Sequence, residues 1–481
     1  MHPTPIHRTG ALLLLAASLV AAGAGAARAE IPGIAGSAFT LTARSDRITT
    51  PEGGSYLFWG LASGGGRAQY PAPTLILTSG QTITVTLTNA LAPDGAGAVP
   101  NVSLVFPGQD NVKAFCATGS CVTGALTLEA GPGGSVTYTF TASRPGTFAY
   151  YSGTRPDLQV EMGLTGAIVV RPAAFPASAY GDSTSAFDRE YLFFLSEMDP
   201  RIHDTVEQQG AAALAATDYL SDYFSNYWFI NGRAAPDTMN TTASLFPTQP
   251  YDSMPRMHPG ERLLMRVVGG GSQFHPFHHH GNHARIIGRG GRPLEETAGQ
   301  LDLSYEVFTI QTGPGQAYDA LFEWTGKGLG WDMYGTEGAA ASHLCNGQTG
   351  EWARAERLAN PGNPYFTNYD PTTREWCGDH GMVFPVTLPD PLNLVNGGWW
   401  SGSPYMGTMG ALPPGEGGLN PNAGYVFMWH SHTEKELTNF DVFPGGMMTM
   451  LIIEPVGVPI AAPAPAPNPP PGTAADGPAT R

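Results

Sequence analysis

The stretch Thr82-Ile83-Thr84-Val85-Thr86-Leu87-Thr88 alternates strictly between threonine and apolar residues. Ser135-Val136-Thr137-Tyr138-Thr139-Phe140-Thr141 alternates in the same way. Because successive side chains of a β-strand point to opposite faces, each stretch predicts a strand with one apolar and one polar face. Gly80 and Gly131–Gly134 mark turns next to these strands, at a spacing typical of a β-sandwich. We therefore expect a first sandwich domain over residues 30–175.

The same arrangement returns in the second half of the chain. Gly260–Val268 repeats the turn and strand of Gly80–Thr86, and Glu190–Leu195 predicts a buried strand. Further strands are predicted at Phe308–Gln311, Tyr318–Trp324, Tyr425–Trp429 and Met450–Ile453. We interpret the chain as a degenerate duplication, with a second sandwich domain over residues 188–456.

Two segments depart from the strand pattern. Residues 326–420 are rich in Gly, Pro and Asn and predict a long, loop-rich insertion in the second domain, with a third small domain as the competing interpretation. Residues 457–481 are rich in Ala and Pro and predict a disordered tail. The 62 glycines and 43 prolines, with only 13% charged residues, favour short strands and tight turns over amphipathic helices, so the fold class is all-β.

The start of the chain predicts export. Residues 1–29 have a weakly basic beginning, an apolar run over Ala11–Ala22 and a cleavage site of the small-x-small type at Ala27-Arg28-Ala29. The apolar run is shorter than the ~20 residues that a spanning helix needs, so an uncleaved anchor is the weaker alternative and no membrane span is expected. We expect a periplasmic or extracellular protein.

The net charge limits the partners. Beyond residue 29 the chain has 22 basic and 40 acidic residues, a net charge of −18. An acidic surface repels nucleic acid and anionic lipid and attracts cations. We expect no nucleic-acid partner, while the attraction of cations is compatible with metal handling.

Four cysteines are present in this exported chain. Three pairings are possible, and the local one, Cys116 with Cys121 and Cys345 with Cys377, is favoured in an oxidising compartment. The chain has no CxxC pattern, which argues against zinc or haem attachment through cysteine.

The histidines gather in two places. Eleven of the 13 lie beyond residue 29, and seven of these fall within residues 275–283 and 430–432. Residues i and i+2 of a strand project to one face, so His278 with His280 and His430 with His432 can each offer two imidazoles to a metal. Such pairs suit copper, zinc, iron or nickel.

The same residues carry a family resemblance. His275-Pro276-Phe277-His278-His279-His280-Gly281 resembles the HPFHxHG motif of the multicopper oxidases, and His430-Ser431-His432 resembles their HCH motif. The resemblance implies Greek-key, cupredoxin-like domains and copper as cofactor. It also implies that His278, His280, His430 and His432 are copper ligands and that His275 is a remnant of the type 1 copper site and a further candidate ligand.

The departures from the family are as informative as the matches. Ser431 stands where the family has the type 1 cysteine, and Glu436 where it has the second type 1 histidine, so we expect no blue copper centre. In the first half all four ligand positions are changed; they hold Val105, Pro107, Tyr151 and Gly153. Four of the eight cluster histidines remain, which predicts fewer than four copper ions.

Three functions are compatible with this sequence. The first is a copper-dependent oxidoreductase with a reduced, histidine-only site, acting on a small-molecule or metal-ion substrate. The second is a non-catalytic metal binder or carrier, and the third is a structural or partner-binding scaffold whose histidines are relics. Whether the chain is an enzyme stays open at this point. Two-domain relatives often assemble as head-to-tail trimers, which makes a homotrimer the candidate assembly.

Overall fold

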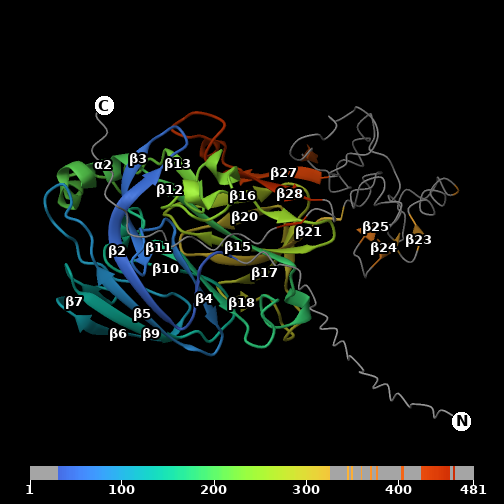
Figure 1. The fold of residues 1–481 in the computed structure, drawn as a ribbon, viewed down its shortest axis with the longest axis horizontal. Coiled ribbons are helices and arrows are strands. Elements are labelled where there is room, and N and C mark those ends of the chain that lie inside the picture. Colours follow the sequence, from blue (N-terminus) through green and yellow to red (C-terminus); the bar gives the residue numbers. More distant parts are fainter. Residues whose placement is uncertain are drawn as a thin grey trace, which may run out of the picture.

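The computed structural model describes residues 31–325 and 424–454, with short segments at 344–345, 348–349, 359, 369–370, 375–376, 402–405 and 459–460 (Figure 1). The proposed signal segment, most of the predicted insertion and nearly all of the tail therefore lie outside the described residues. Five short strands fall between residues 326 and 420: β22 (Leu344–Cys345), β23 (Gln348–Thr349), β24 (Tyr369–Asp370), β25 (Glu375–Trp376) and β26 (Gly402–Tyr405).

The first half of the chain forms a β-sandwich. One sheet has the order β1 (Ile34–Ala35), β4 (Ala72–Thr78), β11 (Thr165–Arg171) and β10 (Gly146–Tyr151). The other has the order β3 (Ser55–Ser63), β2 (Ala38–Thr49), β5 (Thr82–Asn89), β9 (Ser135–Thr141) and β6 (Asp110–Thr118). A small hairpin of β7 (Cys121–Thr123) and β8 (Leu128–Ala130) lies beside them.

The alternating stretches behave as predicted. β5 and β9 pair antiparallel, with Val85 opposite Tyr138. The apolar side chains of both strands are buried in one core with residues of the facing sheet, while the threonines are partly exposed.

Helix α2 (Pro200–Gln209) covers this sandwich, because Ile202 and Val206 join the same core (Figure 1). The remaining short helices are α1 (Pro156–Gln159), η1 (Ser183–Ser185), η2 (Ala211–Ala216), η3 (Asp237–Met239), η4 (Ala243–Leu245) and η6 (Glu434–Leu437).

The second half forms another sandwich. One sheet has the order β13 (Tyr227–Ile230), β12 (Arg189–Met198), β15 (Arg262–Gly269), β21 (Ala317–Glu323), β17 (Ala284–Arg289) and β18 (Arg292–Pro293), with β19 (Tyr305–Val307) on β17. The other has the order β14 (Arg256–Met257), β28 (Met448–Ile453), β27 (Gly424–Ser431), β16 (His275–His279) and β20 (Thr309–Thr312), with β26 on β27. Apolar residues of both sheets share one core.

The central strands of the two sandwiches pair in the same way. In the first sandwich β5 runs parallel to β2 and antiparallel to β9. In the second, β15 runs parallel to β12 and antiparallel to β21. Both β5 and β15 follow a turn that contains a glycine with positive φ, Gly80 and Gly260 respectively. Glycine adopts positive φ without steric cost. The all-β expectation with two sandwiches is confirmed, while the exact domain limits stay a prediction.

Arg266 of β15 joins the two sandwiches through a buried group of charges. Its Nε donates to Glu190 (2.6 Å), and its Nη1 donates to Asp319 (3.0 Å) and to the Thr147 hydroxyl (2.9 Å) of the first sandwich. Thr147 and Tyr180 donate to the same Asp319 carboxylate. An apolar cluster containing Val169 and residues of β12 and β15 lies at the same junction.

No helix in the described part of the chain is long and apolar enough to cross a membrane.

Candidate metal centre

The pairing of β16 with β27 brings the two histidine pairs together. The strands run antiparallel, with His278 directly opposite His430 and His279 opposite Trp429. Directly opposed residues project to the same face of a sheet. Phe277 and Trp429 are buried in the core. Their packing fixes which face the alternate histidines occupy, so His278 and His430 lie together on the other face.

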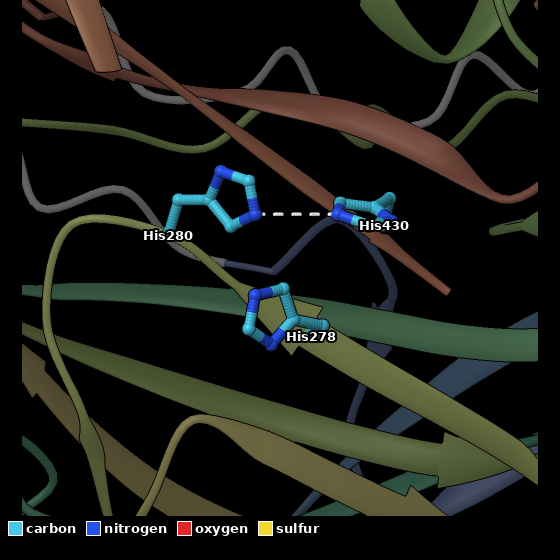
Figure 2. Close-up of side chains that lie close together, drawn as sticks. All are labelled: His278, His280 and His430. Carbon is cyan, nitrogen blue, oxygen red and sulfur yellow. Dashed lines mark hydrogen bonds between the residues drawn. The ribbon is translucent and has the colours of Figure 1, made fainter. Parts of the chain in front are cut away.

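Three imidazoles converge at this point (Figure 2). The ligand nitrogens of His278, His280 and His430 lie within 4.8 Å of one another. His280 Nε2 lies 3.3 Å from His430 Nε2, and the His278 ring centroid lies 4.8 Å from that of His280 and 5.4 Å from that of His430. Among the described residues, this is the one group of three or more candidate ligands that lie close enough together to hold a metal ion. We call it the histidine cluster.

His432, the fourth predicted ligand, lies at the edge of the histidine cluster. Its ring centroid is 4.9 Å from that of His278 and 5.7 Å from that of His430. Its side chain is 56% exposed, whereas His278, His280 and His430 are buried. The structure therefore brings three of the predicted ligands together and leaves the fourth at the solvent-facing rim.

The surroundings favour neutral imidazoles in the cluster. Burial, together with the charges of the neighbouring histidines, lowers the pKa of His278 to about 4. Burial also lowers the pKa of His430. Metal ions bind neutral imidazole, so these shifts preserve the binding form at neutral pH.

The tautomer of His430 is set by its backbone contact. His430 Nδ1 lies 2.6 Å from the Ser431 carbonyl oxygen, which can only accept, so Nδ1 must carry the proton. In a neutral ring Nε2 is then left with a lone pair, and Nε2 is the atom that faces His280. The donor set fits copper, which accepts imidazole ligands.

His275 lies apart from the cluster, in a buried carboxylate pair. Its Nε2 is 2.8 Å from Glu197 Oε2, and its Nδ1 is 3.0 Å from Glu436 Oε2. Burial alone would lower the pKa of His275, but the hydrogen bonds to Glu197 and Glu436 outweigh it and raise the pKa to about 9. Sequence reasoning identified Glu436 by its distance from the HCH-like motif but missed Glu197. The available signal was a carboxylate inside the strongly apolar stretch that follows residue 190.

The first sandwich contributes no residue to the histidine cluster. Val105 and Tyr151, at two of the four changed positions, pair with each other, with the Val105 N–H donating to the Tyr151 carbonyl (2.8 Å). At Gly153 an added Cβ would lie 2.9 Å from Val105 Cγ1, so the space there is already filled. Gly153 is buried, Val105 and Tyr151 are partly buried, and Pro107 is exposed.

The other histidines have separate surroundings. His279 is buried on the core face of β16, where its Nε2 lies 3.0 Å from the Val307 carbonyl, so it points away from the cluster. His203 is buried beside Glu161, and His258 pairs with Glu261. His283 is exposed and lies against Phe308. His343 and His380 are outside the described residues.

A cavity of about 290 Å³ lies where the two sandwiches meet. Tyr151 and Thr165 line it from the first sandwich, and Gly269–Ser272 and Pro314 from the second. None of the clustered histidines lines it, so the cavity is separate from the candidate metal centre.

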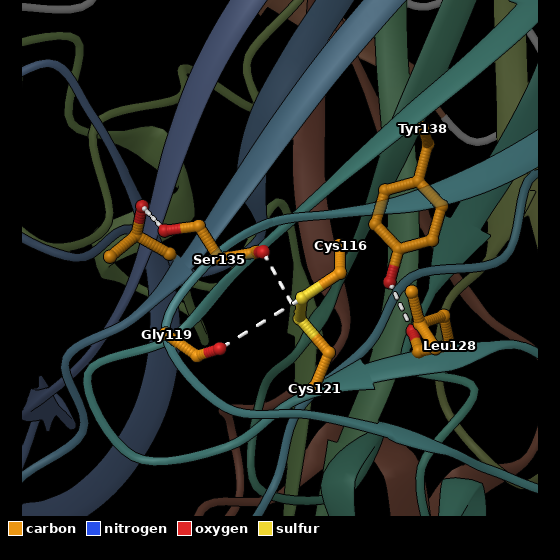
Figure 3. The surroundings of a disulfide bond; sticks show 7 residues. Cys116, Gly119, Cys121, Leu128, Ser135 and Tyr138 are labelled. Carbon is orange, nitrogen blue, oxygen red and sulfur yellow. Dashed lines mark hydrogen bonds between the residues drawn. A yellow bond between two sulfur atoms is a disulfide. The ribbon is translucent and has the colours of Figure 1, made fainter.

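One of the two predicted disulfides is present in the described part. Cys116 and Cys121 are bridged, with their Cα atoms 5.8 Å apart, and the bridge connects β6 to β7 beside Gly119 and Ser135 (Figure 3). The side chains of Cys345 and Cys377 lie outside the described residues, so their pairing stays a prediction.

Comparison with known proteins agrees with the motifs. Residues 65–174 match the family model described as multicopper oxidase. An iron transport multicopper oxidase of Epichloe festucae is 29% identical over 184 residues, a match that covers 38% of this chain and spans only 26% of that relative. The crystal structure of a blue copper oxidase from Nitrosomonas europaea is similar at a TM-score of 0.47 and 18% identity, covering 86% of this chain and 85% of that one. A copper nitrite reductase from the same organism has a TM-score of 0.44 and 19% identity, covering 60% of this chain and 85% of that one.

The family-model match falls in the first sandwich, and the two motifs that resemble the copper-binding motifs of the same family fall in the second. Residues 65–174 are therefore similar to a domain of the multicopper oxidase family.

Proposed function

We propose that this protein is an exported copper oxidoreductase whose copper is bound by histidines of the second sandwich alone. The observation that carries the proposal is the convergence of His278, His280 and His430 from two paired strands, with ligand atoms within 4.8 Å of one another. His432 lies close enough to complete the set by a small movement of its exposed side chain. Copper bound there would supply one-electron redox chemistry.

The protein residues prepare this site in two ways. The low pKa of His278 keeps its ring neutral down to about pH 4, so protons do not compete with the metal at neutral pH. The hydrogen bond from His430 Nδ1 to the Ser431 carbonyl holds one tautomer and aims Nε2 at the cluster. Both features match the needs of a metal ligand.

The proposal includes the absence of a blue copper centre. Ser431 is fully buried, and its hydroxyl accepts a hydrogen bond from the Thr433 N–H (3.1 Å). A hydroxyl does not supply the thiolate on which a blue centre depends. We therefore propose that a small-molecule or metal-ion substrate exchanges electrons directly at the histidine site, without a relay.

A second candidate function is a metal carrier. The observation that favours it is the exposed position of His432, because a ligand at the solvent-facing rim can exchange without opening the core. Oxygen consumption by the copper-loaded protein with a phenolic or ferrous reductant separates the two functions. Turnover that requires copper supports the oxidoreductase, whereas tight copper binding without turnover supports the carrier.

The metal site itself is tested by titration with copper. We expect His278→Ala and His432→Ala each to lower copper affinity at least ~10-fold in calorimetry, the scale that ligand-shell changes produce. His258→Gln, which alters a histidine paired with Glu261, is the control and should bind as the wild type does. The copper-loaded protein should lack an intense thiolate band near ~600 nm. Unchanged copper binding in the double variant His278→Ala with His432→Ala would overturn the proposal and favour a scaffold with relic histidines.

Export and assembly complete the proposal. The segment 1–29 supports a periplasmic or extracellular location, and the family resemblance supports a homotrimer. Cell fractionation and light scattering of the purified protein test these two points. A cytoplasmic full-length chain or a monomeric mass would contradict them.

A further inference from the structure

His275 lies between two carboxylates that come from distant parts of the chain. Glu197 is near the end of β12, His275 begins β16, and Glu436 lies in η6 after β27. The side chains of Glu197 and His275 are fully buried and that of Glu436 is 6% exposed. We call these three residues the Glu-His-Glu array.

The geometry of the array fits a doubly protonated imidazole between two ionised carboxylates. Each ring nitrogen of His275 faces one carboxylate oxygen, at 2.8 Å on the Nε2 side and 3.0 Å on the Nδ1 side. An ionised carboxylate only accepts, so both nitrogens must carry a hydrogen. The Ser272 and Gln273 N–H groups also donate to Glu197, which holds this carboxylate in place.

The same geometry does not fit a metal ion. The two carboxylates approach opposite nitrogens of one ring, so the three side chains do not point at a common centre. Among the described residues, these three side chains are not part of a group that could hold a metal ion. The type 1 copper that the family would place at His275 is therefore replaced by a buried ion cluster.

The array is connected to both strands that carry the candidate ligands. His275 precedes His278 by three residues on β16. Glu436 lies in η6, which begins two residues after His432. The His432 N–H donates to the Pro276 carbonyl (2.8 Å), next to His275. The Met447 N–H donates to the Glu436 carbonyl, and the Ser431 N–H donates to the Met447 carbonyl. Displacing Glu436 would thus disturb the segment that holds His430 and His432.

We propose that the Glu-His-Glu array occupies the vacated type 1 position as an imidazolium between two carboxylates and positions the histidine cluster by fixing η6 to β16. The positioning part rests on the proposed copper site, whereas the state of His275 does not. Because none of its three members belongs to the histidine cluster, they are positioning residues.

The state of His275 is tested on the copper-free protein. We expect nitrogen NMR of histidine-labelled protein at pH 7 to show His275 with hydrogens on both Nδ1 and Nε2, assigned by the loss of its signals in His275→Gln. A neutral ring with one bare nitrogen would overturn the proposal. In this measurement the variant serves only to assign the signals. The result does not depend on copper binding.

The positioning role is tested by copper titration of two variants at one position. Glu436→Ala removes the contact and should lower copper affinity about 10-fold, the scale of changes beside metal ligands. Glu436→Gln retains an acceptor for His275 Nδ1 and should bind within about 3-fold of the wild type. His203→Gln, which alters another buried histidine beside a carboxylate, is the control for general destabilisation.

The outcomes separate the two proposals. Wild-type copper affinity in folded Glu436→Ala, or a loss no greater than that in His203→Gln, would overturn the positioning role. If the wild-type protein itself bound no copper, the proposed function would fail, and the NMR measurement would still decide whether the array holds an imidazolium. If Glu436→Ala did not fold, copper titration of His275→Gln, which removes the ring between the two carboxylates, would decide. A loss of affinity no greater than that in His203→Gln would overturn the positioning role.

Discussion

At the scale of single residues, the nature of a histidine in this protein depends on what its second nitrogen contacts. His430 donates from Nδ1 to a carbonyl, which leaves Nε2 free to act as a metal ligand. His275 has a carboxylate on each nitrogen, which favours the cation. In the sequence, both residues are histidines of motifs that resemble those of the multicopper oxidases. Their opposite chemistry arises from the two carboxylates beside His275, one of which, Glu197, is 78 residues away along the chain.

The raised pKa of His275 predicts a dependence of stability on alkaline pH. The folded-state pKa is about 9, above the value of about 6.5 for an unfolded histidine. The folded state therefore holds its proton more tightly than the unfolded state does. This contribution to stability is fully present below about pH 6.5 and declines as pH rises, until it is lost above about pH 9.

Urea unfolding between pH 6 and 10 measures this effect. The free energy of unfolding of the wild type should fall across this window more steeply than that of His275→Gln, in which the titrating group is absent. His203→Gln is again the control, and it should retain the part of the slope that belongs to His275. Identical slopes for the wild type and His275→Gln would contradict the prediction.

At the scale of strands, the alternating stretches were predictable because half-buried strands carry a period of two. Thr82–Thr88 and Ser135–Thr141 correspond to β5 and β9 almost residue for residue. The alternation in the β16 motif also places His278 and His280 on one side. The sequence could not give the register between β16 and β27, which is set by the packing of Phe277 and Trp429, nor the outward position of His432.

Phe277 should therefore matter both for stability and for the metal site. It is fully buried on the core face of β16 and lies 5.2 Å from the Phe193 ring and 6.3 Å from the Trp429 ring, centroid to centroid. We expect Phe277→Ala to lower the free energy of unfolding by about 3–5 kcal/mol, through lost burial and the cavity that remains. Copper affinity should fall as well, because the strand that carries His278 loses its anchor.

The control for this change is Phe115→Ala. Phe115 lies on β6 with 53% of its surface exposed, so its loss should change stability by no more than about 0.5 kcal/mol and leave copper binding unaffected. Urea unfolding and copper calorimetry on both variants provide the comparison. Equal effects at the two positions would mean that β16 is not held by its core face.

At the scale of the whole molecule, the two sandwiches meet through charges that the sequence did not single out. Arg266, Glu190 and Asp319 come from three strands of the second sandwich and contact Thr147 of the first. Each lies in a stretch that strand periodicity alone assigns to a core. Their pairing depends on the parallel register of β12 with β15 and the antiparallel register of β15 with β21, which are tertiary features. The two sandwiches were predictable, but the contacts at their junction were not.

Arg266 is therefore expected to be the most sensitive charged residue at this junction. Its side chain and that of Glu190 are fully buried, and Asp319 is 1% exposed. Burial alone would raise the pKa of Glu190, but Arg266 and Arg171 outweigh burial and hold it below its usual value. Removing Arg266 leaves two buried carboxylates without their shared cation, a change that costs about 3–5 kcal/mol in comparable buried pairs.

We expect Arg266→Met to lower the free energy of unfolding by that amount at pH 7. The loss should shrink at acidic pH, where Glu190, without the Arg266 charge that lowers its pKa, takes up a proton. Arg155→Met is the matched control, because the Arg155–Asp157 pair is partly exposed and such pairs contribute at most about 1 kcal/mol. Urea unfolding of both variants at pH 5 and pH 7 measures the difference. A loss for Arg266→Met that equals the control, or that does not change with pH, would show that this charge group does not hold the sandwiches together. A loss that grows at lower pH would contradict the assignment of charge to the buried carboxylates.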